Sequence, residues 1–370
     1  MMNSMLHTRT LFNGTPVASA PPVRHFRRIP ALAVCIGMLL TLCACGSASN
    51  MEQKQIFAMD TVMTLTAYGK HAEEGLSAAA SVINAMDAQL DPELPTSTTY
   101  AINNSNGADV VVSAQVAKML STAKTVYDQS GGALDLSIYP VVKLWGFVDG
   151  RYYVPTDAEL SAALVRKAYD RMILTSYPAT GSYSVRFPAG TQISFASVAK
   201  GCAAENAVSA MRQAGVESGI ISLGGNVQTL GMKPDGSKWT VAIQDPNNTS
   251  GWVGTVQVGE MAVVTSGSYQ RYFTYDGKTY HHIISPQSAV PIDNGLLSAT
   301  ILCEDGTMAD ALSTAMFVLG ETRALNYWRS YGGFEMILIN RSGQITCTKG
   351  LIDNFVANSQ ASGYKVRYAE

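Results

Sequence analysis

The pattern of hydrophobic and polar positions switches between two periods along the chain after residue 53. Apolar residues that recur every three or four positions predict helices, and alternating apolar and polar residues predict strands. Five segments have the helical period: "AEEGLSAAASVINAMDAQLD", "SAQVAKMLSTAKTVYDQSGGALD", "YVPTDAELSAALVRKAYD", "ASVAKGCAAENAVSAMRQAG" and "DGTMADALSTAMFVLG". We expect Ser113 to cap the second helix, Gly131-Gly132 to end it, and Thr156 or Asp157 to cap the third.

Strand patterns and turn residues fill most of the remaining chain. The strand-like segments are "KQIFAMDTVMTLTAYG", "SGIISLGG", "NVQTLGM", "KWTVAIQDP", "GTVQVGEMAVVTSG", "RYFTYDGKTYHHII", "LLSATILCE" and "FEMILINRSGQITCTKG". Turn chemistry predicts hairpins at Lys233–Gly236, at Asp276-Gly277 and at Arg341–Gly343, whereas "PELPTSTTYAINNSNGAD" reads as loop. Because helices and hairpins are interleaved, we predict an α+β fold with mostly antiparallel sheets, forming one domain over residues 54–368.

The segment from 305 to 320 is a core helix that carries polar residues on one stripe. Asp310 and Thr314 are four residues apart, so they lie on the same face. In one interpretation Thr307 is the N-cap, Asp310 closes a capping box, and Thr314 bonds the carbonyl of Asp310. In the other, the carboxylate and hydroxyl oxygens bind a hard cation such as Mg²⁺ or Ca²⁺.

Composition and charge narrow the classes of function. The chain has 370 residues, of which 47% are hydrophobic and 15% are charged, and its net charge is −2. This composition is that of a globular protein. No basic surplus favours nucleic acid, so we expect no nucleic-acid partner.

The N-terminal segment has the features of an export signal. Several arginines precede the apolar run "IPALAVCIGMLLTLCAC", which is short for a membrane span. A small residue before Cys45 resembles a bacterial lipoprotein signal, which predicts a signal peptide over 1–44, a lipidated Cys45 and a linker over 45–53. An N-terminal anchor helix is the alternative. The widely spaced Cys202, Cys303 and Cys347 predict no disulfide framework and no zinc site.

Three glycine-marked stretches are candidates for chemistry. In "GGALDLSIYPVVKLWGF", Gly131-Gly132 permits a close backbone approach near Asp135, although a plain helix end looks similar. In "ISFASVAKGCAAE", small residues and Lys200 open a helix, as in a phosphate cradle, although an ordinary amphipathic lysine would also fit. In the third, "VVTSGSYQRYFTYDGKTYHHIISPQSAVPI", adjacent His281 and His282 face opposite sides of a strand, which leaves one acid–base histidine and no metal pair.

Taken in order, these stretches resemble the ApbE family of FAD:protein FMN transferases. The matching motifs are Met59-Asp60-Thr61, Gly132-Ala133-Leu134-Asp135 with Pro140 and Leu144–Phe147, Ser194–Gly201, Gly224-Gly225, Pro234-Asp235-Gly236 with Trp239, Ile243–Pro246, Thr265–Phe273, His282–Pro286, and Ala309-Asp310-Ala311 with Thr314. They span about residues 54–350. Where the family has glycine and two aspartates, this chain has Asp60, Ser194 and Ser285.

The resemblance implies a set of site residues. It assigns Mg²⁺ to Asp310, Thr314 and a backbone oxygen of Ser197. It assigns FAD contacts to Met59, Ala133, Leu134, Asp135, Ser194, Lys200 and Ile284. His282 is our candidate for the general base, and an equally open alternative is that it only positions the flavin or the acceptor.

The resemblance also implies a reaction and a location. A threonine hydroxyl of an exported or membrane redox protein attacks the FMN phosphorus of FAD, AMP leaves, and FMN remains as a phosphoester. The loss of charge at Ser194 keeps two alternatives open, an Mg²⁺-dependent FAD pyrophosphatase and a non-enzymatic FAD-binding lipoprotein. The predicted location is the extracytoplasmic face of a bacterial cell membrane, reached through the lipid anchor.

Overall fold

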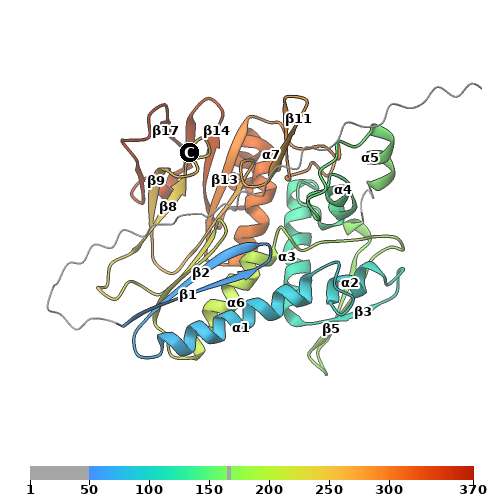
Figure 1. The fold of residues 1–370 in the computed structure, drawn as a ribbon, viewed down its shortest axis with the longest axis horizontal. Helices are drawn as coiled ribbons and strands as arrows, with labels where there is room; N and C mark the ends of the chain where they lie inside the picture. The colour runs from blue at the N-terminus through green and yellow to red at the C-terminus, as the bar shows by residue number, and fades with distance from the viewer. Residues whose placement is uncertain (1–49, 165–167) are drawn as a thin grey trace, which may run out of the picture. The chain divides into compact units, whose positions relative to one another are not determined.

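Helices cover one face of a long, mostly antiparallel sheet in this computed structural model, which describes residues 50–164 and 168–370 (Figure 1). These residues belong to one compact unit, Ala48–Glu370. The predicted signal peptide and Cys45 lie outside the described residues.

The principal sheet has nine strands in the order β1-β2-β6-β7-β10-β13-β14-β15-β17. Every neighbouring pair is antiparallel except β15 and β17. The strands are β1 (Met51–Ala58), β2 (Thr61–Tyr68), β6 (Ser218–Leu223), β7 (Asn226–Leu230), β10 (Ala262–Gly267), β13 (Leu296–Cys303), β14 (Glu335–Asn340), β15 (Gln344–Thr348) and β17 (Lys365–Ala369).

Three smaller sheets accompany it. One is β16-β9-β8, a second is β3-β5-β4, and the third is the hairpin β11-β12. Their strands are β3 (Val110–Val112), β4 (Ile173–Tyr177), β5 (Ser182–Arg186), β8 (Trp239–Gln244), β9 (Trp252–Val258), β11 (Tyr272–Tyr275), β12 (Lys278–His281) and β16 (Phe355–Ala357).

The helices of the described residues follow from caps and apolar stripes. They are α1 (Ala72–Leu90), α2 (Thr98–Asn103), α3 (Ala114–Ser130), α4 (Tyr139–Leu144), α5 (Asp157–Ala163), α6 (Ala199–Gln213) and α7 (Gly306–Tyr331), with short 3₁₀ turns η1 (Leu136–Ile138), η2 (Tyr169–Arg171) and η3 (Lys349–Leu351). Ser113 caps α3, and Gly131 ends it with a left-handed φ of 65°. Thr156 and Glu159 form a capping box at α5.

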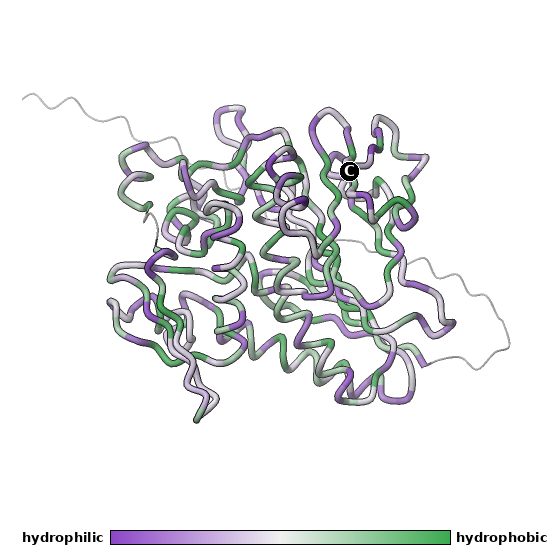
Figure 2. Tube along the Cα trace, turned by 180° about the vertical axis from the view of Figure 1, so that it is seen from behind, coloured by the Kyte–Doolittle hydropathy of each residue, from purple (hydrophilic) through white to green (hydrophobic). Residues whose placement is uncertain are grey.

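The core lies on both faces of the nine-stranded sheet. One face, with Met63, Leu65 and Val264, packs against α1, α3, α6 and α7. The opposite face, with Val263 and Ile337, packs against the β8–β9–β16 sheet. Strand residues alternate between the two faces because successive side chains of a strand point to opposite sides. Figure 2 shows the hydrophobic residues along these helices and strands, and mostly hydrophilic or neutral connections between them.

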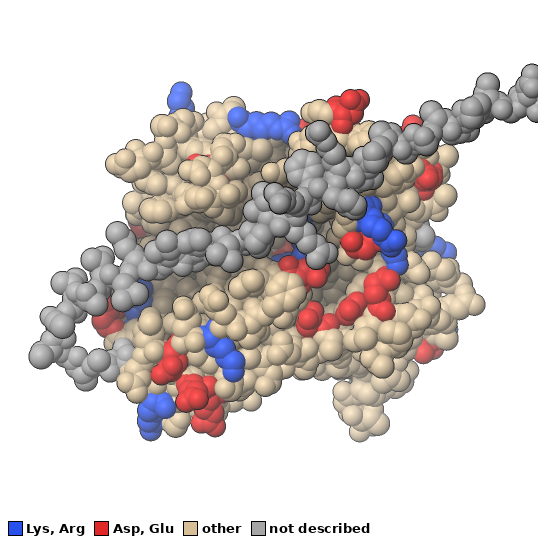
Figure 3. Space-filling view, viewed as in Figure 1, with Lys and Arg blue, Asp and Glu red and all other residues tan. Residues whose placement is uncertain are grey.

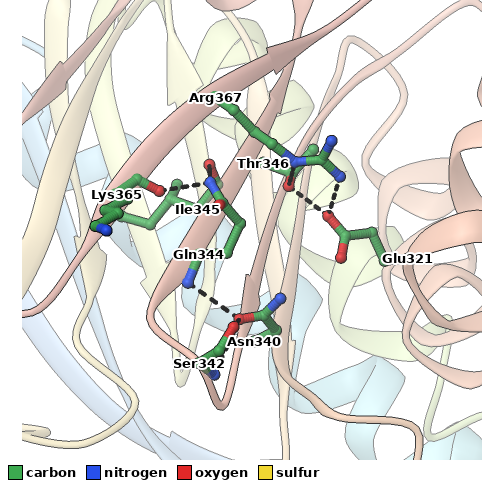
Figure 4. A network of polar contacts seen from close by, with 8 residues as sticks. All are labelled: Glu321, Asn340, Ser342, Gln344, Ile345, Thr346, Lys365 and Arg367. Atoms are coloured by element: carbon green, nitrogen blue, oxygen red, sulfur yellow. Dashed lines mark hydrogen bonds and ion pairs between the residues drawn. The ribbon is translucent and has the colours of Figure 1, made fainter.

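The last strand is tied to the sheet by side chains as well as by its backbone. Arg367 donates from Nη2 to Glu321 Oε1 (2.7 Å) and from Nε to Thr346 Oγ1 (2.9 Å), and the Gln344 amide donates to the Lys365 carbonyl at 2.7 Å (Figure 4). The Asn340 side chain orders the preceding turn by accepting from Ser342 and from the backbone of Gln344. The parallel β15–β17 pairing therefore closes the far edge of the sheet.

The α+β prediction with mostly antiparallel sheets is confirmed, and four local predictions are wrong. The segment 54–69 is two strands joined at Met59-Asp60, and the predicted loop contains α2. The Lys233–Gly236 turn does not join a hairpin, because β7 and β8 belong to different sheets that cover different parts of the core. The segment "GTVQVGEMAVVTSG", whose pattern resembles a hairpin, forms β9 and β10, and for the same reason these two strands do not pair.

Two further observations concern the whole described part of the chain. Within residues 50–164 and 168–370, no helix combines the length and the apolar character that crossing a membrane requires. Among the described residues, Cys202, Cys303 and Cys347 are free and buried.

Candidate functional site

Two tight turns and a strand end meet at one edge of the nine-stranded sheet. Met59 and Asp60 both have positive φ (48° and 58°), so they form the two-residue turn between β1 and β2. Gly224-Gly225 makes the corresponding turn between β6 and β7, and a Cβ on Gly224 would lie 2.3 Å from Thr61 Oγ1. Only glycine permits this close approach. The Gly225 carbonyl in turn accepts from the backbone of Thr265 at 3.1 Å.

The Met59 turn is held by a carboxylate of α1. The backbone N–H of Met59 donates to Asp87 Oδ1 at 3.0 Å. Burial raises the pKa of Asp87, the Met59 N–H opposes that rise, and the charge of Asp60 adds to it. Met59 itself is half-buried against the main core, so its backbone is presented at the edge of the sheet.

The N-terminal halves of α6 and α7 touch backbone to backbone. The Gly201 N–H donates to Asp310 Oδ2 at 2.9 Å, and Asp310 is only 3% exposed. A Cβ on Gly201 would lie 2.0 Å from the Gly306 carbonyl oxygen and 2.7 Å from Asp310 Cβ. Glycine at 201 therefore allows the contact that buries the carboxylate at the start of α6.

The first turns of α7 contradict the predicted capping box. Asp305 is the N-cap and accepts from the Met308 N–H, whereas Thr307 lies inside the helix and donates to Glu205 on α6 at 3.0 Å. Thr307 cannot cap because its backbone is already helical. Asp310 closes no box, since its carboxylate faces α6.

The hydroxyl that bonds the Asp310 carbonyl is that of Ser313, and not that of Thr314. Ser313 Oγ donates to the Asp310 carbonyl at 2.9 Å, so the predicted bond from Thr314 is not formed. Thr314 Oγ1 instead lies 3.3 Å from Ser266 Oγ on β10, and Ser266 is 2.8 Å from Ser313 Oγ. A line of oxygens therefore runs from Asp310 along α7 to the end of β10.

The carbonyl of Ser197 is left without a backbone partner among the described residues. Ser197 precedes Val198, the N-cap of α6, so the helix itself offers this carbonyl no donor, and the N–H of Gly201, one of the first N–H groups of the helix, donates to Asp310. Asp310 makes no ion pair within residues 50–164 and 168–370, and no group of three or more His, Cys, Asp or Glu residues gathers there. One carboxylate, hydroxyls and a carbonyl form a donor set that suits a hard cation, with water and phosphate completing its shell.

Asp135 and Ser194 lie in neighbouring loops. The Ser194 N–H donates to the Leu136 carbonyl at 3.1 Å, and Asp135 Oδ1 accepts from the backbone and the hydroxyl of Ser137. Burial raises the pKa of Asp135, which these bonds partly oppose. Ser194 Oγ accepts from the Ala196 N–H at 3.3 Å, so the hydroxyl shapes the turn before α6. The preceding side chains, Ala133 and Leu134, are buried.

A basic corner adjoins the Met59 turn. Arg271 Nη1 is 3.7 Å from Asp60 Oδ2, and the Arg271 carbonyl accepts from the backbone and the ring of His282. Burial, with the cations Arg271 and Lys200, lowers the pKa of His282 to about 3. The face seen in Figure 3 carries scattered acidic and basic side chains without a continuous basic area.

The hydrogen bonds define the tautomers of both histidines. His282 Nδ1 is 3.2 Å from the Arg271 carbonyl and must carry the proton, so Nε2 keeps its lone pair. His281 is 7% exposed; its Nε2 faces the Ile292 carbonyl at 2.8 Å and its Nδ1 accepts from the Ile283 N–H. The two rings serve different sides of the strand, and only His282 faces the basic corner.

Ile284 packs in a hydrophobic cluster, and Ser285 holds a turn. Ile284 is buried with Trp145 and Phe147 and forms a β-bridge with Pro291. Ser285 Oγ accepts from the N–H groups of Gln287 and Ser288, both at 3.2 Å. Serine therefore performs the turn-capping that an aspartate would perform there.

Hydrogen bonds join Gly201 to Asp310, Ser266 to Thr314, Arg271 to His282 and Leu136 to Ser194, whereas Ile284 packs in a separate cluster with Trp145. Sequence reasoning missed several residues that hold the predicted residues: Asp87, Gly201, Ser266, Arg271 and Ser313. Gly201, Ser266 and Arg271 stand inside the motifs, and no local signal marks Asp87.

The fold and the site together define a class of protein. It is an α+β protein in which a buried carboxylate, a helix N-terminus and a basic corner meet at the edge of an antiparallel sheet. Residues 59–338 match the ApbE family, and the chain belongs to that family.

Curated relatives and solved structures agree with this membership. The FAD:protein FMN transferase of Treponema pallidum (strain Nichols) is 29% identical over 340 residues, covering 86% of this chain and 94% of the relative. The transferase of Klebsiella pneumoniae (strain 342) is 33% identical over 246 residues, 66% of this chain and 75% of the relative.

The structural neighbours extend the likeness to the whole fold. The ApbE protein of Thermotoga maritima has a TM-score of 0.74 at 25% identity, covering 82% of this chain and 98% of that one. The apo flavinyl transferase ApbE of Pseudomonas stutzeri has a TM-score of 0.68 at 26% identity, covering 84% and 94%.

Proposed function

We propose that this chain transfers FMN from FAD to a threonine hydroxyl of an acceptor protein, in a reaction that depends on Mg²⁺. The hydroxyl oxygen forms a new bond to the FMN phosphorus, the bridging P–O bond breaks, and AMP leaves with the electron pair. The hydroxyl proton passes to a base of the protein. Membership of the ApbE family and the names of the relatives support this proposal.

One observation carries the metal dependence. Asp310 is a buried carboxylate whose charge is balanced by no side chain among the described residues and by a single N–H from Gly201. Such a charge is costly to bury unless a counter-charge is present. Thr314 and the Ser197 carbonyl supply further oxygens, so these three residues would hold Mg²⁺. When bound, the cation would neutralise phosphate charge and polarise the phosphoryl oxygen.

The remaining residues bind and orient the substrates. The N-terminus of α6 favours an anion through the helix dipole, although the N–H groups of Ala199 and Gly201 are already engaged, and Lys200 and Arg271 add positive charge near His282. The backbone at Met59 and at Ala133–Asp135, together with Ser194 and Ile284, would contact FAD, since these positions match the motifs of the family.

His282 is the proposed general base. It is neutral at pH 7, and its Nε2 lone pair is directed away from Arg271, so it can accept the hydroxyl proton. Its pKa is low chiefly because the ring is buried, and also because Arg271 and Lys200 are close; the phosphates of FAD would offset those two charges and raise the pKa.

The test is an assay with FAD, Mg²⁺ and a candidate exported acceptor, read as covalent flavin fluorescence in a denaturing gel. We expect fluorescence only when FAD, metal and acceptor are all present. Rapid AMP release without an acceptor would instead indicate a pyrophosphatase. Stoichiometric FAD binding without AMP would indicate a binding protein, and either result would overturn the transferase.

We also propose that the chain is anchored by lipid on Cys45 at the extracytoplasmic face of the cell membrane. The apolar run that ends in Ala44-Cys45 supports this. In a bacterial host, the wild-type protein should be recovered in the membrane pellet, whereas the Cys45→Ala variant should carry no lipid. If the masses of the mature N-terminal segments of the two proteins differ only by the substitution, the proposed lipid anchor is overturned.

A further inference from the structure

Asn226 is a buried carboxamide that the protein does not satisfy. It is 2% exposed, and its Nδ2 has no hydrogen-bond partner among the described residues. Buried polar groups are nearly always paired, so an unpaired one points to a missing water, ion or ligand. Asn226 begins β7 directly after the Gly224-Gly225 turn, at the site edge of the sheet.

The strand register places Asn226 on the helix-covered face. Asn226 is paired with Val264 on β10, and cross-strand partners share a face. Val264 belongs to the core beneath the helices. Ser266, two residues further along β10, shares that face and lies 3.3 Å from Thr314.

The close approach of Gln228, two residues along β7, to Gly306 indicates which turn of α7 lies above Asn226. Gln228 Oε1 lies 2.9 Å from the place a Cβ would take on Gly306, so Gln228 is beneath the first residue of α7. Two residues of a strand span about 6.6 Å and one turn of a helix spans about 5.4 Å, so a step of two residues along β7 corresponds to a step of one turn along α7. Asn226 is therefore beneath the next turn of α7, which carries Asp310.

We propose that Asn226 is a binding residue of this site, whose Nδ2 donates to an oxygen that the ligand brings. That oxygen is either a water on the divalent cation or a phosphate oxygen of FAD; both are acceptors, as the unpaired donor requires. The inference rests on the proposed cation–phosphate site. It adds a residue of the sheet, beneath the site, to the proposed ligands on the helices.

The experiment compares Asn226→Leu and Asn226→Ala with wild type by titration calorimetry, first with Mg²⁺ alone and then with FAD in the presence of Mg²⁺. Loss of the donor should weaken one of the two affinities about tenfold. A change already present with Mg²⁺ alone assigns the contact to a cation-bound water, and a change seen only with FAD assigns it to a phosphate.

The matched control is Ser298→Ala. Ser298 is also fully buried, and its hydroxyl is unpaired among the described residues, but it lies next to Ile339, which belongs to the opposite face of the sheet. It should change neither affinity. Unchanged affinities in both folded Asn226 variants would overturn the inference.

A third variant separates this proposal from the proposed function. If Asp310→Ala loses Mg²⁺ binding while the Asn226 variants keep it and keep FAD binding, the function stands and only the role of Asn226 fails. If wild type itself binds no Mg²⁺, the cation site fails first. Thermal unfolding of each variant verifies that it is folded at the titration temperature.

Discussion

The backbone N–H of Gly201 donates to the carboxylate of Asp310 at 2.9 Å across 109 residues of sequence. Gly201 is in the first turn of α6, where the N–H groups have no partner within the helix, so this bond places the carboxylate at the start of α6. The helix dipole stabilises a negative charge at that place, and the carboxylate would bind the proposed cation through its other oxygen.

Asp310→Asn should abolish flavin transfer while preserving the fold. The amide oxygen can still accept from Gly201, but the charge that would bind Mg²⁺ is lost. We expect a fall in the rate on the order of a hundredfold or more. Covalent flavin per minute is the measurement, and Mg²⁺-induced thermal stabilisation, present in wild type and absent in the variant, is the independent readout. A variant with wild-type rate would refute the metal assignment.

The stability of the protein should fall as pH decreases from about 6.5, because His282 resists protonation in the folded state. Its folded pKa is about 3, whereas in the unfolded chain it is about 6.5. The unfolded state therefore binds more protons between these values, and stability is complete above pH 6.5 and lost toward pH 3.

Urea unfolding at pH 7.5 and pH 5 tests this dependence. His282→Gln should lose less stability between the two values than wild type does. His281→Asn is the comparison, because burial also lowers the pKa of His281. An identical loss in wild type and His282→Gln would contradict the assignment.

Asp60→Gly should strengthen FAD binding in this chain. Asp60 stands where the family has glycine, and its carboxylate is 3.7 Å from Arg271. Its removal leaves Arg271 free for phosphate, and glycine suits the positive φ of the turn. Because the pair is exposed, unfolding free energy should change by less than about 1 kcal/mol.

The affinity for FAD, measured at low and high salt, is the readout for Asp60→Gly. We expect a gain of a few fold that shrinks as salt screens the charges. Asp60→Asn, which keeps a side chain suited to the turn, should give the same gain. A gain that is independent of salt would indicate a conformational cause.

Ser285→Asp should be tolerated, whereas Ser285→Ala should destabilise the loop before β13. Ser285 Oγ accepts from two N–H groups, and an aspartate at the same position can accept both. Loss of the acceptor in alanine should cost about 1 kcal/mol. Chemical unfolding distinguishes them, and an activity lost in Ser285→Asp would show that the charge matters more than the cap.

Much of the local structure could be predicted because its causes are local. Ser113 and Gly131 bound α3, Thr156 caps α5, and Asp276-Gly277 turns between β11 and β12, each through contacts of a few residues. The wrong predictions share another cause. Lys233–Gly236 is a good turn by its residues, but which strands it connects depends on which sheet each strand buries its face against.

The order of short motifs by itself indicated the family, and the alternation of helix and strand patterns indicated the α+β class. Only the tertiary structure decided how the site residues are held: that Asp310 accepts from Gly201 and caps nothing, that Ser313 and not Thr314 bonds the Asp310 carbonyl, and that His282 faces Arg271. A pattern along the chain reports contacts within one or two helical turns. The packing of α6 on α7 and on β7 depends on which surfaces fit and bury together, and no stretch of sequence contains both sides of that contact.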